Sequence, residues 1–157
     1  MDFELNDEQR MLQESAQRFV QKSYTFEHRR NLASQGGGFS RETWRTLGEM
    51  GWLGVAVPEE MGGLGFSPVE SAIVAEQIGR TLVLEPYVMC GVFPASLVTR
   101  CGREGQRETL LEEIVSGETV YAVAHSEREA RGQVHYVTAT AKKTEAMRRT
   151  SGMMTRK

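Results

Sequence analysis

The sequence predicts a mainly α-helical domain that is followed by an incomplete β domain. Amphipathic segments with helix-start and helix-stop signals cover most of residues 6–117. Two stretches rich in β-branched and aromatic residues, 119–124 and 134–140, come after them. Apolar side chains make up 39% of the 157 residues, which is enough for a hydrophobic core. The order of the two patterns indicates a helical domain that leads into β structure.

Two capping boxes mark the clearest helix starts. Asn6 with Gln9 begins the first helix, and Ser67 with Glu70 begins a later one, in which Pro68 takes the first helical position. An apolar stripe at helical spacing follows each cap. The stripes consist of Leu12, Ala16, Phe19 and Val20 in the first helix and of Val69, Ala72, Ile73, Val74 and Ile78 in the other.

The region between these two helices is expected to hold one short helix and several loops. Ser40 can cap a helix that Gly48 and Gly51 would end. The polar residues 25–38 finish in a run of glycines and predict a loop. Residues 59–66, which also contain several glycines, predict a second, turn-rich loop.

Two more helices are expected before the β-prone stretches. Pro86 can open one of them, and Pro94 would kink or restart it. The other spans about residues 104–116. We therefore assign residues 1–117 to a helical domain and residues 118–141 to the start of a β domain.

Residues 142–157 differ in composition from the rest of the chain. The whole chain has a formal net charge of −2, but this tail carries six basic side chains against the single acidic side chain of Glu145. It has no apolar periodicity, so we expect a basic, disordered tail. Binding to nucleic acid is not expected, because the tail has no interleaved aromatic side chains that could stack on bases.

Simple patterns exclude several classes of protein. No stretch approaches the roughly 18 consecutive apolar residues of a membrane-spanning helix. The acidic N-terminus lacks the apolar segment of a secretory signal, so we expect a cytoplasmic protein. Cys90, Cys101 and the scattered histidines form no metal-binding pattern and no nucleophile–base set. Neither a metal site nor a catalytic residue is assigned from them.

One block of the sequence carries a family resemblance. It covers residues 47–65 and contains the run Pro-Glu-Glu-Met-Gly-Gly-Leu-Gly. The capped helix of residues 67–80 and the opening residues 6–10 fit the same pattern in the same order. Over about residues 3–140 the chain resembles the N-terminal part of the acyl-CoA dehydrogenases.

The resemblance implies a fold and a reaction. Proteins of this family have an N-terminal helical domain, a middle β domain and a C-terminal helical bundle, with FAD between the last two. They remove an α-proton from an acyl-CoA thioester, stabilise the developing enolate by hydrogen bonds, and pass the β-hydrogen as hydride to the flavin. The base is usually a glutamate of the C-terminal bundle. We therefore expect no catalytic residue and no turnover in these 157 residues alone.

The same resemblance implies residues that contact the cofactor. The family's flavin-binding motif has four consecutive positions, which hold a small residue, then Leu, then Thr or Ser, and then Glu. It resembles Ala124, His125, Ser126 and Glu127. Ser126 would hydrogen-bond the flavin ring, and backbone groups of Ala124 and His125 would support it. FAD is thus the implied cofactor, with weak or no binding expected in this chain alone.

Two further sets of residues are implied to meet the acyl-CoA substrate. The first aligns roughly with the family's acyl-pocket wall, although core packing explains its pattern equally well, and consists of Tyr87, Met89, Val92 and Phe93. The second is Arg128 and Arg131, which stand where the family usually has Pro and then a Gly-Ser/Thr-Asp group. These arginines could bind a CoA phosphate or an acidic acyl group, or simply lie on the surface.

The resemblance also implies partners, namely an acyl-CoA substrate, an electron-transfer flavoprotein as electron acceptor, and other subunits in a homo- or hetero-oligomer. Two alternatives stay open. In the first, the chain is a non-catalytic fragment, produced by truncation or by a shifted reading frame after Ala141. In the second, it is a helical interaction module that pairs with a complete subunit.

Overall fold

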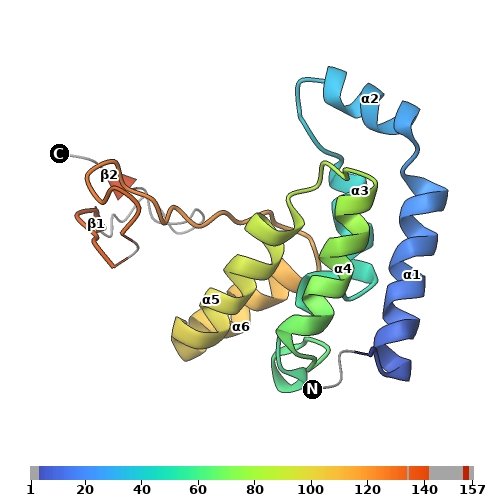
Figure 1. Cartoon of the computed structure of the whole chain (residues 1–157). Coiled ribbons are helices and arrows are strands. Elements are labelled where there is room, and N and C mark those ends of the chain that lie inside the picture. Colours follow the sequence, from blue (N-terminus) through green and yellow to red (C-terminus); the bar gives the residue numbers. More distant parts are fainter. Residues whose placement is uncertain (1–3, 134, 142–153, 156–157) are drawn as a thin grey trace. The chain divides into compact units, whose positions relative to one another are not determined.

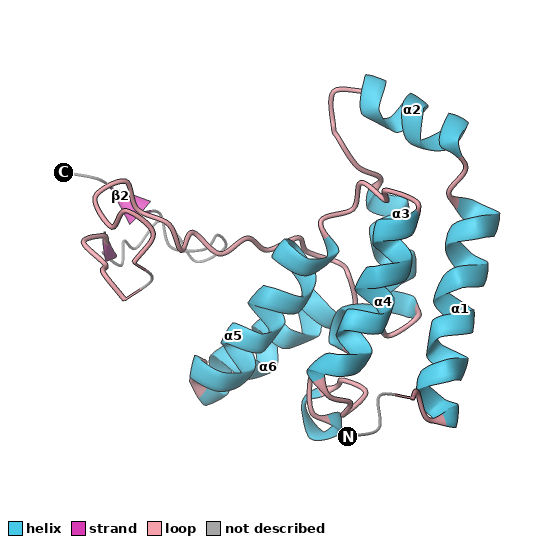
Figure 2. Cartoon of the chain, viewed as in Figure 1, coloured by secondary structure: helices cyan, strands magenta, loops and turns pink. Residues whose placement is uncertain are grey.

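The computed structural model describes residues 4–133, 135–141 and 154–155 of the chain (Figure 1). It divides into two compact units, Met1–Val123 and Ala124–Lys157. The first unit is helical, whereas the described part of the second consists of loops and turns with one short strand pair (Figure 2). Among the described residues, no helix combines the length and apolar character that a membrane span requires.

The helices of the first unit follow the predicted order. Its α-helices in the described residues are α1 (Asp7–Ser23), α2 (Phe26–Ser34), α3 (Arg41–Glu49), α4 (Pro68–Arg80), α5 (Phe93–Cys101) and α6 (Glu104–Val115). Shorter helical turns join them, namely the 3-10 helices η1 (Trp52–Gly54) and η2 (Glu59–Met61) and the π-helix η3 (Tyr87–Val92). Helix α1 lies along α4, and α5 lies along α6 (Figure 1). The prediction of a mainly helical domain is confirmed.

Both predicted capping boxes form, and one hydrogen bond joins them. Asn6 and Gln9 exchange hydrogen bonds at the start of α1, as Ser67 and Glu70 do at the start of α4. The side-chain amide of Gln9 also donates to the Glu70 carboxylate, with 2.7 Å between Nε2 and Oε1. One carboxylate thus helps to satisfy the backbone donors at the start of α4 and ties that helix to α1.

The main core lies where α1, α3, α4, η1 and η3 meet. Its two largest buried side chains are Trp44 of α3 and Trp52 of η1. Phe19, from the predicted stripe on α1, meets Trp52 edge to face with 5.4 Å between the ring centroids. A second cluster fills the space between α5 and α6 and consists of Val57, Ala95, Leu111 and Ile114. Burial of these apolar groups is the main stabilising contribution to the unit.

The loop predicted over residues 25–38 contains a helix, so that prediction is wrong for α2. Thr25 caps α2, since its hydroxyl oxygen accepts a hydrogen bond from the His28 amide at 3.2 Å. No residue of α2 is buried. The helix therefore has no apolar stripe that periodicity could detect, and its cap and polar helix formers support it instead.

Gly48 has a different role from the predicted helix stop. It lies inside α3, which ends at Glu49, and Gly51 just beyond the helix has the left-handed conformation with φ 74°. A Cβ atom on Gly48 would lie only 2.4 Å from the carbonyl oxygen of Ser116. The missing side chain therefore allows α3 to approach the end of α6 closely.

The β-prone stretches form almost no strand. Residues 119–124 are loop, and of residues 135–140 only Thr140 lies in a strand. Val120 and Tyr121 instead pack against the helices, and the Tyr121 hydroxyl donates to the Glu113 carboxylate at 2.5 Å. The predicted strand extents are wrong because β-prone side chains form strands only where neighbouring strands supply hydrogen-bond partners. The compact helical unit consequently extends past residue 117 to Val123.

The described strands are two residues long. Strand β1 (Thr140–Ala141) pairs antiparallel with β2 (Met154–Thr155), and Thr140 lies opposite Thr155. The residues of β2 belong to the segment predicted to be a disordered tail, and that prediction stays a prediction. The other tail residues, 142–153 and 156–157, lie outside the described residues.

Candidate functional site

The π-helix η3 carries most of the residues that the sequence suggested for an acyl-pocket wall. Tyr87 is only 2% exposed, and its hydroxyl donates to the Trp52 carbonyl at 3.1 Å. Burial raises the pKa of Tyr87, so the hydroxyl stays a donor. Met89 is 50% exposed, while Val92 and Phe93 are half-buried. The placement of Tyr87 favours core packing, and that of Met89 leaves it open to a ligand.

The segment that leads into η3 is anchored to both neighbouring helices. The Leu84 amide donates to the hydroxyl of Tyr24 at the end of α1, at 2.9 Å. The buried Glu85 carboxylate accepts a hydrogen bond from the Ser40 amide at the start of α3, at 3.0 Å. Burial, helped by the nearby Glu85 carboxylate, raises the pKa of Tyr24 to about 12. These contacts fix the position from which η3 begins.

A small cavity lies beside η3. Its volume is about 80 Å³, and its wall includes Val92. The other lining residues come from η1, α4, α5 and the chain after η1, and they are Leu53, Ala56, Val57, Pro68, Ser71, Ala95 and Ser96. Apart from two serines, the lining side chains are apolar, so the surface of the cavity is mostly apolar. Of the four acyl-wall candidates, only Val92 contributes to this cavity.

The flavin-motif residues lie in the second unit. Ala124, His125 and Ser126 are exposed and form neither helix nor strand. The adjacent Glu127 is half-buried, and its carboxylate accepts hydrogen bonds from the Thr138 and Ala139 amides at 2.8 and 3.0 Å. The predicted cofactor residues thus form one exposed segment with an anchored neighbour.

The two candidate arginines belong to the same unit as Ser126. Arg128 and Arg131 are exposed and lie in one turn. Arg131 adopts a left-handed backbone with φ 46°, and Gly132 follows with φ 87°. The structure therefore brings the cofactor and arginine candidates into one unit, while the acyl-wall candidates belong to the helical unit.

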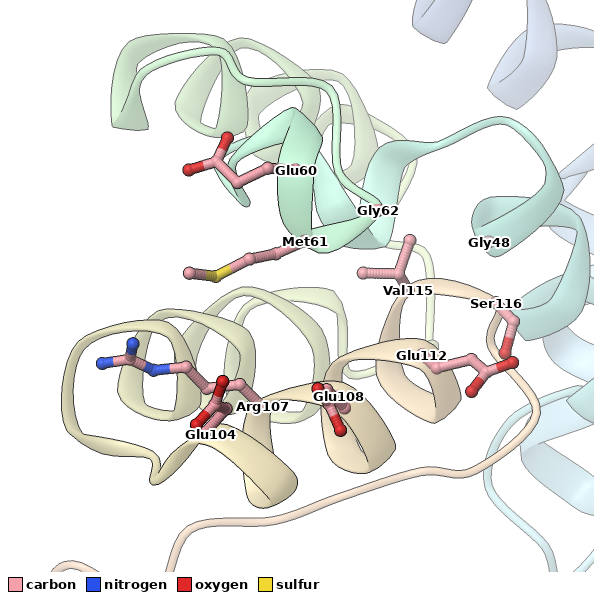
Figure 3. A pocket seen from close by; sticks show the side chains of 10 residues that line it. All are labelled: Gly48, Glu60, Met61, Gly62, Glu104, Arg107, Glu108, Glu112, Val115 and Ser116. Carbon is pink, nitrogen blue, oxygen red and sulfur yellow. The ribbon is translucent and has the colours of Figure 1, made fainter.

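A larger pocket, between η2 and α6, was not foreseen from the sequence. It has a volume of about 860 Å³, within the usual range for ligand sites. The side chains of Met61 from η2 and Val115 from α6 point into the space between these elements (Figure 3). Residues far apart in sequence form this pocket, so no local pattern reveals it. The one sequence feature that could have indicated this pocket is the recurrence of a glutamate at every fourth position of α6, at Glu104, Glu108 and Glu112.

The charges around this pocket do not suit the phosphate end of a CoA thioester. Its charged lining consists of four carboxylates and one guanidinium, from Glu60, Glu104, Glu108, Glu112 and Arg107. Two like charges about 4 Å apart repel by roughly 4 kcal/mol near a protein surface. A polyanion is therefore disfavoured here, and the pocket fits an uncharged or cationic group. The candidate substrate residues lie elsewhere.

Metal chemistry finds no support among the described residues, where no group of three or more His, Cys, Asp or Glu side chains could hold an ion. The chemistry open to the candidate residues is hydrogen bonding by Ser126, apolar contact along η3, and anion binding by the two arginines.

The helical unit has the architecture of an N-terminal domain of a dehydrogenase. Residues 6–118 match the family model described as acyl-CoA dehydrogenase, N-terminal domain. The match begins at the Asn6 cap of α1 and ends just after α6. The chain belongs to the acyl-CoA dehydrogenase family, and the resemblance seen in its sequence is confirmed.

Known relatives are longer than this chain. The mitochondrial isovaleryl-CoA dehydrogenase of Bos taurus is 32% identical over 132 residues, which are 83% of this chain and 31% of that protein. In the ChsE4-ChsE5 complex from Mycobacterium tuberculosis, the matching chain is 30% identical with a TM-score of 0.76, over 92% of this chain and 38% of that one. An acyl-CoA dehydrogenase complexed with FAD from Bacillus anthracis is 26% identical with a TM-score of 0.72, over 88% of this chain and 24% of that one. The chain thus spans 31% of the length of the curated relative.

Proposed function

We propose that this chain is the N-terminal portion of an FAD-dependent acyl-CoA dehydrogenase, which forms a double bond between the α and β carbons of an acyl-CoA thioester. The observation that carries the proposal is the match of residues 6–118, which contain α1 to α6, to the N-terminal domain of the family. The hydrogen bond between the caps of α1 and α4 and the buried tryptophans belong to a hydrophobic core within this unit. FAD, when bound, accepts the hydride.

The flavin contact is proposed for Ser126, with backbone support from Ala124 and His125. The residues fit this role in type, since an exposed hydroxyl and exposed backbone groups can hydrogen-bond a flavin ring. The Bacillus anthracis relative, which was solved with FAD, supports the choice of cofactor. A flavin needs contacts from several segments, so the 157-residue chain alone should bind it weakly or not at all.

The substrate is proposed to be an acyl-CoA that meets η3. Met89 is the strongest of the four wall candidates, because it is half exposed. Val92 and Phe93 could complete an apolar wall, and Tyr87 would support it from the core. Arg128 and Arg131 are exposed cations that could bind a CoA phosphate or an acidic acyl group.

The complete protein is proposed to act with other proteins. It would pass electrons to an electron-transfer flavoprotein, and it would assemble with further copies or with a related subunit. The second of these proposals is supported by the matched ChsE4-ChsE5 structure, which is a complex of two differently named proteins.

A chimera tests the proposed reaction. Residues 6–118 of this chain would replace the aligned segment of the Bos taurus isovaleryl-CoA dehydrogenase. We expect the chimera to bind FAD and to reduce a dye acceptor when acyl-CoA is added. The same chimera with Trp44→Asp, which places a charge in the core, serves as the inactive control. A folded, FAD-bound chimera that reduces no dye with acyl-CoAs of short, branched or long chain would contradict the proposal.

The chain alone has its own test. We expect no dye reduction from the 157-residue chain with added FAD and acyl-CoA, because it spans 31% of its curated relative. Turnover clearly above a sample without protein would show that the expectation is wrong. A yellow protein that carries one flavin per chain through gel filtration would refute the prediction of weak FAD binding.

The alternative function is a helical interaction module, and one observation favours it. Three large apolar side chains of η3 and α5 are well exposed, namely Val88, Met89 and Leu97. Such side chains are typical of protein contacts when they cluster on one surface. Gel filtration of this chain with a complete acyl-CoA dehydrogenase subunit tests the idea. Co-elution that is lost in Met89→Ser would support the module, and separate elution would leave the enzymatic proposal.

A further inference from the structure

The proposed flavin contact lies on a segment that has no regular structure of its own. Ala124, His125 and Ser126 are exposed loop residues. A binding residue must be held within about 0.5 Å of its productive position, and loops achieve this only when neighbouring groups fix them. The side chain of the next residue, Glu127, supplies such an anchor.

The Glu127 carboxylate spans two consecutive backbone amides further along the chain. Its Oε2 accepts from the Thr138 amide at 2.8 Å, and its Oε1 accepts from the Ala139 amide at 3.0 Å. The Thr138 hydroxyl also donates to Oε2. Hydrogen bonds to an ionised carboxylate are stronger than those between neutral groups. Three of them on one side chain fix the backbone position of Glu127.

These bonds join the two ends of a loop, and its described residues, 127–133 and 135–138, form further backbone hydrogen bonds. The Ala130 amide donates to the Glu127 carbonyl at 3.2 Å, and the Gln133 amide donates to the Ala130 carbonyl at 2.8 Å. Ala130 is buried. Glu127 therefore lies at the base of a closed loop and uses both its backbone and its side chain there.

We propose that Glu127 is a positioning residue that presents Ser126 to the flavin without touching the cofactor itself. The role at the flavin rests on the proposed function. The physical cause is the anchor, because Thr138 and Ala139 directly precede strand β1 and tie the motif segment to it. Restricting the backbone at Glu127 restricts the adjacent peptide of Ser126 as well.

The test uses the full 157-residue chain and the variants Glu127→Gln and Glu129→Gln. The second variant removes the same charge at an exposed position two residues away and serves as the matched control. In Glu127→Gln we expect amide hydrogen exchange at Thr138 and Ala139 to become about tenfold faster, the scale of a lost charge-assisted hydrogen bond. Backbone order parameters of His125 and Ser126 should fall below about 0.6. Equal exchange, or unchanged order parameters, would overturn the proposal.

Addition of FAD gives a separate readout that a purely structural role would not move. Excess FAD makes weak binding visible, so we expect the amide resonance of Ser126 to shift with excess FAD in the unsubstituted chain and in Glu129→Gln, and to shift less in Glu127→Gln. An equal shift in all three would overturn the positioning role. If the Ser126 resonance does not shift in the unsubstituted chain even with excess FAD, the flavin contact requires the other segments of the complete protein. The exchange and order-parameter results still decide whether Glu127 holds the segment. Circular dichroism of the helical unit should be the same in all three proteins.

Discussion

The lack of a side chain at Gly48 allows α3 to pack closely against the end of α6. A Cβ there would lie 2.4 Å from the Ser116 carbonyl oxygen and 2.8 Å from the Gly117 nitrogen, both of which are backbone atoms. We expect Gly48→Ala to lower the free energy of unfolding by about 1–3 kcal/mol, because α3 and the end of α6 must move apart. Urea unfolding followed by circular dichroism measures the change.

Gly79 offers the matched control for this substitution. It lies inside α4, and nothing would come within 4 Å of an added Cβ. Gly79→Ala should raise stability by up to about 1 kcal/mol, since alanine is the better helix former. A Gly48→Ala protein as stable as Gly79→Ala would refute the close approach of the two helices.

The roles of Tyr87 and Met89 can be separated in the chimera described above. Tyr87→Phe removes the hydrogen bond to the Trp52 carbonyl, so we expect a loss of about 0.5–1.5 kcal/mol in stability and an unchanged KM. Met89→Ala should raise the KM for acyl-CoA and change stability by at most about 0.5 kcal/mol, because Met89 is half exposed. A raised KM in Tyr87→Phe with full stability would place its hydroxyl at the substrate.

At the scale of elements, Glu70 joins two helices. It is 7% exposed, and its carboxylate accepts hydrogen bonds from the Ser67 amide, the Ser67 hydroxyl and the Gln9 amide group. Burial by itself raises the pKa of this carboxyl, but the hydrogen bonds from Ser67 and Gln9 outweigh burial and lower the pKa to about 2. The ionised form is therefore the one that the folded protein prefers.

This preference predicts a pH dependence of stability. Between the ordinary carboxyl pKa of 4.5 and the folded value of about 2, the unfolded chain binds a proton that the folded chain does not. The stabilisation by Glu70 should be complete above about pH 4.5 and lost as the pH falls to 2. Urea unfolding at several pH values measures this slope.

Two substitutions on α4 test whether Glu70 causes this pH dependence of stability. Glu70→Gln should lower stability near neutral pH and flatten the slope between pH 4.5 and 2. Glu76→Gln is the control, because Glu76 forms an exposed ion pair with Arg80 at 2.8 Å and such pairs contribute little. A Glu70→Gln protein with the original slope would mean that other carboxylates cause the pH dependence.

At the scale of the whole molecule, the two units should differ in stability. Arg128 and Arg131 lie exposed in a turn, whereas Ile73 and Leu111 are buried in the helical unit. We expect trypsin to cut after Arg128 or Arg131 early and to leave a fragment that contains α1 to α6. Mass spectrometry identifies the fragment, and hydrogen exchange should be slowest around Ile73 and Leu111. Earlier cuts after Arg80 or Arg107, inside or at the end of helices, would contradict this division.

The sequence by itself determined what depends on neighbouring residues. The capping boxes at Asn6 and Ser67 and the apolar stripe of α1 follow from spacings of three or four residues, and the restart at Pro94 follows from the proline ring. The block at residues 47–65 gave the family, since its order of Pro, Glu and Gly is itself a local pattern. The candidate flavin segment around Ser126 was likewise identified from a local resemblance to the family's motif.

Only the tertiary structure decided which distant groups meet. The bond from Gln9 to Glu70 links residues 61 positions apart, and the Glu127 anchor reaches 11 and 12 positions along the chain. The pocket between η2 and α6 and the approach of Gly48 to Ser116 have the same origin. Local spacing carries no record of such contacts, because they exist only in the folded chain. Between the helices, burial of the core brings the contacting groups together. The β-prone residues 119–124 became loop for the related reason that Val120 and Tyr121 found the helical core to pack against.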